Sequence, residues 1–254
     1  MDAPVDYQVS GGVAWLTINR PEARNALNNA VRQGLWAGFR RFQADDNAHV
    51  LVLTGAGDVA FCAGGDLKEM ADLGMKEPDP LYLPVLGTNI QMSKPVVAAV
   101  NGYAYGGGFL LAQMCDLCIA SETAKFAVTE ARLGRGAPWA APLPWLISPR
   151  NALELLLTGE AVTAKRAYEI GLVNRVVPAA SLHESAESLA ATIAANAPLS
   201  VRASKEMVYA VRGLQHDAAH RIATDLWRPV YLSDDSQEGP RAFQQGRVPA
   251  WRGR

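Results

Sequence analysis

Short, continuous apolar runs recur through the first half of the chain and form its clearest pattern. Runs of this length, rich in Val, Leu, Ile and Ala, are typical of strands buried on both faces. They cover residues 50–54, 96–100 and 117–120. An earlier strand is predicted over Val13–Ile18, paired with Tyr7–Ser10 across a Gly-Gly turn. The segments between these strands are long enough for crossover helices, so this half predicts an α/β core.

A first helix is predicted between the strands at 13–18 and 50–54. Asn28 or Asn29 can cap its N-terminus, because both side chains accept hydrogen bonds from free backbone N–H groups. Its apolar residues follow helical spacing, at Val31, Leu35, Trp36, Phe39 and Phe42. Arg32, Arg40 and Arg41 form a local basic set on the same helix.

The pattern becomes helical after about Pro149. Predicted helices cover 151–157, 164–170, 182–196, 201–211 and 218–232, punctuated by glycine and proline. Only Val173–Val177 has the character of a strand, and 246–254 is expected to be an extended arm. This last third predicts a small helical domain or an oligomerisation layer.

Composition and charge limit the functional classes. A formal net charge of −1 over 254 residues gives no whole-chain attraction to nucleic acid or to an anionic membrane, so neither partner is expected. The acidic start, Met1–Asp6, lacks the pattern of a secretory signal, and no apolar run is long enough to span a bilayer. Three cysteines fit a reducing compartment, which predicts a cytoplasmic protein with buried thiols. The four histidines and the cysteines at 115 and 118 lack further ligands at metal-binding spacing, so no metal is expected.

Two glycine-rich turns carry the candidate chemistry. They are Ala60–Met70, after the strand at 50–54, and Asn101–Leu111, after the strand at 96–100. A strand followed by glycines and a helix start leaves backbone N–H groups unpaired and accessible to a ligand. One such turn is weak evidence, but a pair can supply the two N–H donors that an oxyanion hole needs.

The motifs in and around these turns resemble those of the crotonase, or enoyl-CoA hydratase/isomerase, superfamily. The family carries N-R-P-x-x-x-N-A-L-N, A-F-x-A-G-x-D-[IL]-K-E-M, N-G-x-A-x-G-G-G and C-D-[IL]-x-[IV]-A-S. Matching stretches lie at 19–28, 60–70, 101–108 and 115–121, and the likeness extends to the C-terminal tail. The resemblance implies a spiral core of ββα turns over residues 1–195, with a coenzyme A thioester site. It also implies a helical region over 196–254 that drives formation of a homotrimer or a dimer of trimers.

The resemblance also assigns site residues by motif position. The thioester oxygen would lie between the backbone N–H groups of Gly65 and Gly107. The CoA moiety would be lined by the backbone at Arg24, Ala26, Leu27, Ala63, Gly64, Asp66 and Leu67. Phe243 and Arg247 match tail positions that close over the adenine end, sometimes from a neighbouring subunit. Coenzyme A is part of the substrate, and no separate cofactor is expected.

The catalytic acids depart from the family pattern. True hydratases use two glutamates, one to activate water and one to handle the proton at Cα. Leu110 occupies the position of the first and cannot carry a proton, whereas Glu130 occupies the position of the second. Trp139 replaces a small residue of the family motif and is expected to reshape the acyl pocket. The segment Ala71–Leu86, with Tyr82 among its apolar residues, is expected to cover that pocket.

A single well-placed carboxylate predicts an acyl-CoA enzyme in which Glu130 moves a proton along a thioester enolate. Double-bond isomerisation is the simplest such reaction, and hydration or dehydration follows closely. Thioester hydrolysis and decarboxylation use the same oxyanion hole and remain open alternatives, as does a CoA-ester binding protein without catalysis.

Overall fold

The computed structural model describes residues 3–254, so the first two residues of the acidic N-terminal stretch lie outside the described residues. Its larger sheet has six strands, and its first two form the predicted hairpin across Gly11 and Gly12. All the other neighbours in this sheet are parallel. In sheet order the strands are β1 (Val5–Ser10), β2 (Val13–Ile18), β3 (Val50–Gly55), β5 (Val96–Val100), β7 (Leu117–Ser121) and β10 (Arg175–Val177).

A second sheet of four short strands lies beside the first, and the sequence pattern did not predict it. Three of its strands each follow a strand of the larger sheet, so the chain repeats one turn as a spiral: β3 to β4, β5 to β6, β7 to β8. Three residues are too few to show a period, which is why the hydrophobic pattern missed them. The strands are β4 (Ala60–Cys62), β6 (Tyr103–Tyr105), β8 (Lys125–Ala127) and β9 (Val162–Thr163).

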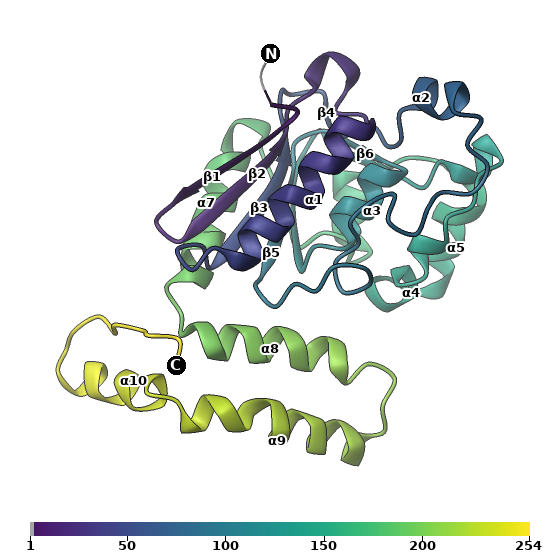
Figure 1. Cartoon of the computed structure of the whole chain (residues 1–254). Coiled ribbons are helices and arrows are strands. Elements are labelled where there is room, and N and C mark those ends of the chain that lie inside the picture. The colour runs from purple at the N-terminus through teal and green to yellow at the C-terminus, as the bar shows by residue number, and fades with distance from the viewer. Residues whose placement is uncertain (1–2) are drawn as a thin grey trace.

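Helices cover both faces of the larger sheet, and this explains its continuous apolar strands (Figure 1). Helix α1 (Asn29–Ala44) packs on one face, and α7 (Leu182–Ala194) packs on the other through Leu182, Ala186 and Ala190. Asn28 is the cap of α1, and its side chain accepts a hydrogen bond from the Val31 N–H at 3.0 Å. The cysteines at 62, 115 and 118 are free thiols buried in the core, as predicted.

Shorter helices complete the core. Between β3 and β5 the expected crossover helix is only six residues long, and 73–95 forms neither helix nor strand apart from an isolated bridge. The short helices are α2 (Leu67–Asp72), α3 (Gly107–Gln113), α4 (Leu143–Leu146), α5 (Pro149–Thr158) and α6 (Ala164–Glu169). Single 3₁₀ turns occur at η1 (Pro21–Ala23), η2 (Glu130–Leu133), η3 (Pro138–Ala140) and η4 (Ala179–Ser181).

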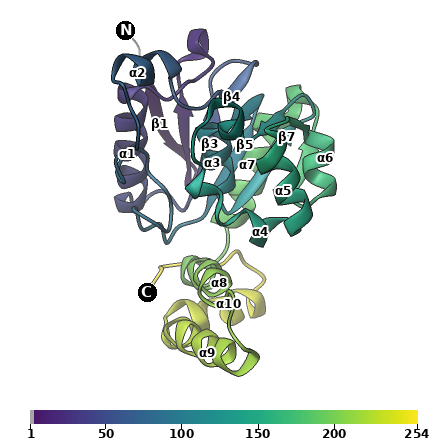
Figure 2. The same cartoon turned by 90° about the vertical axis from the view of Figure 1, so that its right-hand side faces the viewer.

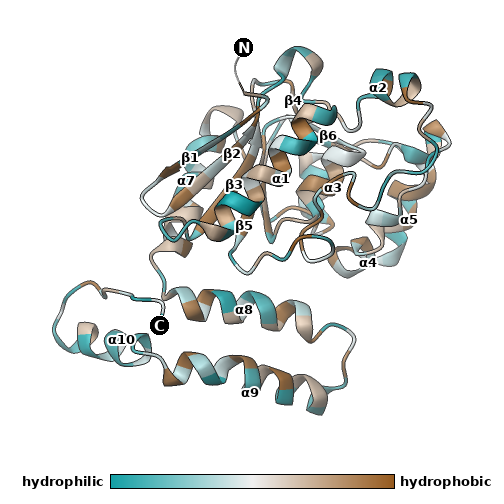
Figure 3. Ribbon diagram, viewed as in Figure 1, coloured by the Kyte–Doolittle hydropathy of each residue, from teal (hydrophilic) through white to brown (hydrophobic). Residues whose placement is uncertain are grey.

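Three C-terminal helices stand apart from the core, as Figures 1 and 2 show. They are α8 (Pro198–Ala210), α9 (His216–Leu232) and α10 (Asp235–Gln244). The sequence pattern missed α10, because Gly239 and Pro240 interrupt a polar segment. Hydrophobic positions recur along α8 and α9 (Figure 3), yet α9 buries none of its residues within this chain.

The tail after α10 has no regular structure and folds back on these helices. The Trp251 indole N–H donates to the Ala195 carbonyl at 2.8 Å, at the junction between the core and the C-terminal helices. No helix among residues 3–254 is both long and apolar enough to cross a membrane.

Candidate active site

The two glycine turns lie side by side because β4 and β6, the strands that lead into them, are neighbours in the smaller sheet. Gly64 and Gly106 have φ values of +97° and +52°, where a side chain is strained. A Cβ on Gly64 would lie 2.8 Å from the Tyr105 carbonyl oxygen and 3.4 Å from the Gly107 nitrogen. Glycine is therefore required for the two turns to approach this closely.

This approach brings the two predicted oxyanion donors together. A Cβ on Gly107 would lie 3.8 Å from the Gly65 nitrogen. Gly107 begins α3, where an N–H has no partner within the helix. Within residues 3–254 neither the Gly65 nor the Gly107 N–H donates a hydrogen bond. Two adjacent unpaired donors are an arrangement that can hold one developing negative charge.

The Arg24–Leu27 backbone runs along the outer side of the first turn. The Leu27 N–H donates to the Gly64 carbonyl at 2.8 Å, and the Ala63 N–H donates to the Arg24 carbonyl at 3.0 Å. Leu27 and Gly65 thereby form an isolated parallel bridge. The structure thus brings the predicted CoA-lining positions 24–27 and 63–67 together at one edge.

The buried side chain of Asn25 stabilises this edge through hydrogen bonds to the backbone. It is fully buried at a φ of +56°, and its amide donates to the carbonyls of Ala56 and Ala60 at 3.0 and 2.8 Å. Its side-chain oxygen accepts from the Arg20 N–H at 3.0 Å. One side chain therefore pairs with three backbone groups, of which the Ala60 carbonyl also accepts from the Asn101 amide at 3.4 Å.

Glu130 places its carboxyl beside the second turn. It begins η2, and its Oε1 lies 3.2 Å from the position that a Cβ would take on Gly106. Its Oε2 is buried and has no hydrogen-bond partner within residues 3–254. Burial raises the pKa of the carboxyl, and the Trp139 side chain and the backbone N–H groups of Glu130 and Thr129 lower that pKa by less. A buried carboxyl with a free oxygen can exchange a proton with a ligand.

Leu110 and Trp139 form the apolar surroundings of that carboxyl. Leu110 lies on α3, is 4% exposed and belongs to the main core, so nothing at this position can transfer a proton. The Trp139 ring is tilted against Phe109, with the ring centroids 6.0 Å apart. Gln113 donates to the Trp139 carbonyl at 3.1 Å and thereby ties η3 to α3.

The acidic residues at the start of α2 form hydrogen bonds and ion pairs with neighbouring residues. Asp66 caps α2 through the N–H groups of Lys68 and Glu69, and it pairs with Arg20 at 2.6 Å. The Arg20 side chain is the main reason that the pKa of Asp66 lies below its usual range. Glu69 accepts from the Asn29 N–H at 2.7 Å and forms an ion pair with Arg32. Leu67 is largely exposed.

Arg32 is a residue beside the site that sequence reasoning did not single out. It shares the first helix with the exposed Arg40 and Arg41, but its own side chain is only 7% exposed. It donates to the Leu27 carbonyl at 2.8 Å and to the Tyr82 hydroxyl at 3.0 Å. The available signal was its place among apolar residues of the buried helix face, one position after Val31.

Phe243 and Arg247 are not brought to the glycine turns within one chain. The C-terminal helices and α2 lie at opposite ends of the molecule in both views (Figures 1 and 2). Phe243 is 89% exposed, and Arg247 pairs with Glu238 at 2.5 and 3.0 Å. A contact between these residues and a thioester site would require a neighbouring copy of the chain.

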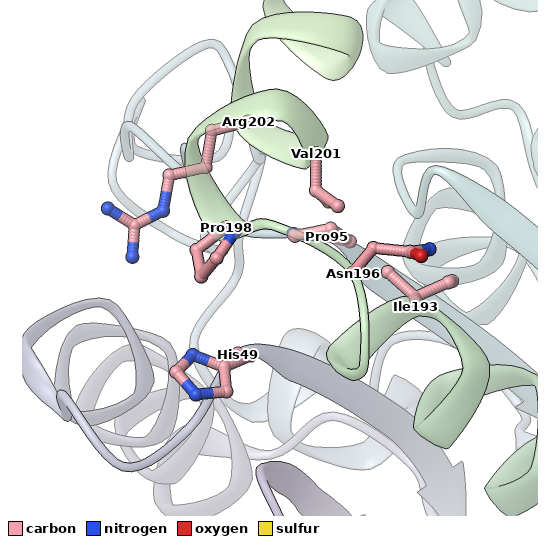
Figure 4. A pocket seen from close by; sticks show the side chains of 7 residues that line it. All are labelled: His49, Pro95, Ile193, Asn196, Pro198, Val201 and Arg202. Carbon is pink, nitrogen blue, oxygen red and sulfur yellow. The ribbon is translucent and has the colours of Figure 1, made fainter. Parts of the chain in front are cut away.

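A small pocket also lies where the core meets α8, away from the glycine turns (Figure 4). His49 from the core faces Pro198 and Arg202 there. Burial, and then the charges of Lys94 and Arg202, lower the pKa of His49. A neutral imidazole at this junction is consistent with packing between the two parts of the chain.

Comparisons with known proteins identify the class to which this fold and site belong. The family model for enoyl-CoA hydratase/isomerase matches residues 8–254. The (E)-benzylidenesuccinyl-CoA hydratase of Thauera aromatica is 40% identical, covering 98% of this chain and 99% of that one. The carnitinyl-CoA dehydratase of Proteus mirabilis is 38% identical over the full length of both. The crystal structure of a probable enoyl-CoA hydratase/isomerase from Mycobacterium abscessus superposes with a TM-score of 0.90 at 37% identity, covering both chains completely.

The chain belongs to the enoyl-CoA hydratase/isomerase family, that is, to the crotonase superfamily. The predicted mixed α/β fold with C-terminal helices is confirmed, and the protein is an acyl-CoA enzyme of this family.

Proposed function

We propose that the protein adds water to the double bond of a 2-enoyl-CoA thioester, or removes water in the reverse direction, with Glu130 as its acid–base residue. The observation that carries this proposal is the half-buried Glu130, whose Oε2 is buried and unpaired, beside the turn that carries the Gly107 N–H. The names of the full-length relatives, a hydratase and dehydratases, favour the addition or removal of water over the other reactions.

In the proposed reaction the thioester oxygen accepts hydrogen bonds from the Gly65 and Gly107 N–H groups. Ionised Glu130 takes a proton from water as the water oxygen attacks Cβ, and the negative charge moves to the thioester oxygen between the two donors. The enolate then takes that proton from Glu130 to form the C–H bond at Cα, so that one water is added and the carboxylate is regenerated. The loss of one donor from such a site typically costs about 2.7–4 kcal/mol of barrier, so the two N–H groups carry much of the rate.

The CoA moiety would run along the edge formed by the backbone of residues 24–27 and 63–67, while the acyl group would lie between Trp139 and the 71–86 segment. Coenzyme A belongs to the substrate, so the reaction calls for no separate cofactor. The half-buried Trp139 narrows this space, which favours particular acyl groups over others.

Double-bond isomerisation is the second candidate. Leu110 leaves only one of the two family carboxylates, and a single base that removes a proton and returns it elsewhere suffices for that reaction. Isomerisation leaves the mass of the acyl-CoA unchanged, whereas hydration adds one water.

The test compares wild type with Glu130→Gln on crotonyl-CoA, on a 3-enoyl-CoA and on a 3-hydroxyacyl-CoA, following enoyl-thioester absorbance and product mass. Glu184→Gln, an exposed residue on α7, is the matched control. A loss of about 10²–10⁴-fold in kcat in Glu130→Gln alone, with acyl-CoA binding kept, supports the proposal. Equal turnover in both variants contradicts it, and release of free CoA or of carbon dioxide points to a hydrolase or a decarboxylase. Binding without turnover in wild type points to a non-catalytic CoA-ester binder.

We also infer that α8–α10 assemble the protein as a homotrimer or a dimer of trimers. Exposed apolar side chains on these helices support this, with Tyr231, Leu232 and Phe243 74%, 76% and 89% exposed. Assembly would let Phe243 and Arg247 of one copy reach the site of another. Light scattering of wild type and Leu232→Asp tests it: a trimer or hexamer that the substitution dissociates is expected, and a monomeric wild type excludes it.

A further inference from the structure

One arginine near the site has no acidic partner. Arg20 and Arg32, beside the first glycine turn, pair with Asp66 and Glu69. Arg135 lies on the loop after η2, is half-buried, and forms no ion pair within residues 3–254. A guanidinium keeps its charge at neutral pH, and a partly desolvated charge is normally neutralised by a counter-ion. Arg135 is thus a cation that the described chain leaves without a counter-ion.

The backbone holds Arg135 close to Glu130. Gly134 ends η2 with a φ of +63°, and the N–H groups of Gly134 and Arg135 both donate to the Glu130 carbonyl, that of Arg135 at 2.9 Å. Paired bonds of this kind close a helical turn at a left-handed residue. The same loop continues to Trp139, so it carries the proposed acid–base carboxyl, the guanidinium and the ring that narrows the acyl space.

The side chain of Arg135 reaches the 71–86 segment, so it extends from the loop of Trp139 to the segment proposed to cover the acyl group. Its Nη1 donates to the Met75 carbonyl at 2.7 Å. This contact fixes the guanidinium, but a carbonyl has no net charge and leaves the cation unneutralised. The Nε and Nη2 groups have no hydrogen-bond partner in the described part of the chain. Together they form one edge of the guanidinium, which can donate two parallel bonds to a carboxylate.

The hydroxyl of Tyr82 is a second free donor near this guanidinium. Burial raises the pKa of Tyr82, and the nearby charges of Arg32 and Arg135 act against that rise. The phenol oxygen accepts from Arg32 at 3.0 Å, and because a guanidinium can only donate, the phenol hydrogen has no acceptor within residues 3–254. The oxygen lies 4.0 Å from the position that a Cβ would take on Gly65, so this donor is also close to the predicted oxyanion donors.

Both donors are held in place although the 73–95 segment has almost no regular structure. The carbonyl before Tyr82 accepts from the Trp36 indole at 3.1 Å, and the carbonyl after it accepts from the Asn89 amide at 2.9 Å. Arg135 is held by its bond to Met75. Groups that are fixed before a ligand arrives lose little conformational entropy when they bind it.

We propose that the acyl group of the substrate carries a carboxylate bound by Arg135 and the Tyr82 hydroxyl, so that the protein acts on 2-enoyl-CoA thioesters of dicarboxylic acids. The inference deepens the hydratase function proposed above and rests on the place which that function gives the acyl group. The methyl end of an ordinary fatty acyl chain would leave both polar groups without a partner in the complex. The carboxylate takes no part in the reaction and holds the acyl group in place against the oxyanion donors.

The kinetic test compares substrates of equal length that end in a carboxylate or in a methyl group. The pairs are glutaconyl-CoA with 2-pentenoyl-CoA, 2-hexenedioyl-CoA with 2-hexenoyl-CoA, and 2-octenedioyl-CoA with 2-octenoyl-CoA. In at least one pair, wild type is expected to have a kcat/KM about 10–10²-fold higher for the carboxylate. Arg135→Met should remove this preference and Arg135→Lys should keep part of it. Arg132→Met, an exposed arginine of η2, is the matched control and should keep it fully.

The ratio within a pair isolates the carboxylate contact. Loss of the bond from Arg135 to Met75 also loosens the covering segment, but that effect is common to both members of a pair. Calorimetry with the saturated esters adipoyl-CoA and hexanoyl-CoA, and with the other two saturated pairs, tests the same contact without turnover. Tyr82→Phe is expected to weaken the binding of the dicarboxylic ester by about 10-fold and to leave that of its methyl-ended partner unchanged.

Equal kcat/KM and equal affinity within every pair would overturn the inference, and so would a carboxylate preference that Arg135→Met keeps. If Arg135→Met weakens free CoA and every CoA ester alike, the guanidinium binds a phosphate of coenzyme A, and the inference is again overturned. A wild type that hydrates no enoyl-CoA, but whose preference for binding dicarboxylic esters is lost in Arg135→Met, would overturn the proposed function and support the carboxylate site.

Discussion

The Glu130 Oε1 and Gly106 are so close that a methyl group on Gly106 would lie 3.2 Å from that oxygen. Gly106 is thus a glycine for two separate reasons. Its φ of +52° disfavours a side chain, and the space that a side chain would need is occupied by the carboxyl.

We therefore expect Gly106→Ala to reduce kcat through displacement of Glu130, beyond its effect on stability. Gly106 has a φ of +52° and a ψ of −118°, a conformation that costs about 1–3 kcal/mol for a residue with a Cβ, and the contact with the carboxyl adds to that cost. The measurement is kcat together with the free energy of unfolding. Gly213→Ala is the control, because its φ is +72° and a Cβ there would meet nothing within 4 Å. Equal losses of activity in the two variants would show that strain alone is responsible.

The pH dependence of activity should report the environment of Glu130. Burial raises the pKa of this carboxyl from 4.5, and the proposed base is active only when ionised. We expect kcat/KM for hydration to fall on the acid side around a midpoint above 4.5, measured in buffers of constant ionic strength. A midpoint at or below the ordinary value would argue against Glu130 as the base.

The same shift predicts how Glu130→Gln changes stability. A carboxyl with a raised pKa binds its proton more tightly in the folded protein than in the unfolded chain. The stability that it contributes is present below the unfolded pKa and is lost as the pH rises through the folded value. The unfolding free energy of wild type should therefore fall relative to Glu130→Gln as the pH rises from about 4 to about 8. Chemical denaturation at several pH values measures this, and parallel curves would contradict it.

Asn25 should be more important for stability than its small size suggests. Asn25→Ala removes the donor to the Ala56 carbonyl and the acceptor of the Arg20 N–H, at about 1–3 kcal/mol for each buried group, while the Ala60 carbonyl keeps the Asn101 amide at 3.4 Å. Asn25→Asp should also destabilise the fold, because a carboxylate cannot donate to the two carbonyls. Thermal unfolding measures both, with the exposed Asn47→Ala as control. Unchanged unfolding of Asn25→Ala would mean that water replaces the lost amide.

Glu238 should hold the C-terminal tail in place. Its carboxylate accepts from Arg247 and from the Ala250 N–H, and the Arg247 side chain is the main reason that its pKa lies at about 2. A lowered pKa means that this contribution is present above the unfolded value and is lost as the pH falls through about 2. We expect Glu238→Ala to speed tryptic cleavage after Arg247 and Arg252, followed by mass spectrometry. Glu184→Ala is the control, and equal cleavage rates would show that the tail is held by Asp235 and Trp251 instead.

The amino-acid sequence by itself determined the strands of the larger sheet, the first helix and its cap, and the two glycine turns. These features are encoded locally: apolar runs buried on both faces, an asparagine before an amphipathic segment, and glycines where the backbone is left-handed or closely approached. Residue type at Leu110 was also enough to show that one family carboxyl is absent.

Only the tertiary structure decided what lies beside each turn. The three-residue strands of the smaller sheet have no periodic signal, yet their pairing brings Gly65 next to Gly107. Arg32 and Tyr82 are 50 residues apart and belong to a helix and an irregular segment, so no local pattern connects them. Their contact follows from the way 73–95 packs over α1 and α2, because side-chain proximity across such distances is set by packing and not by sequence spacing.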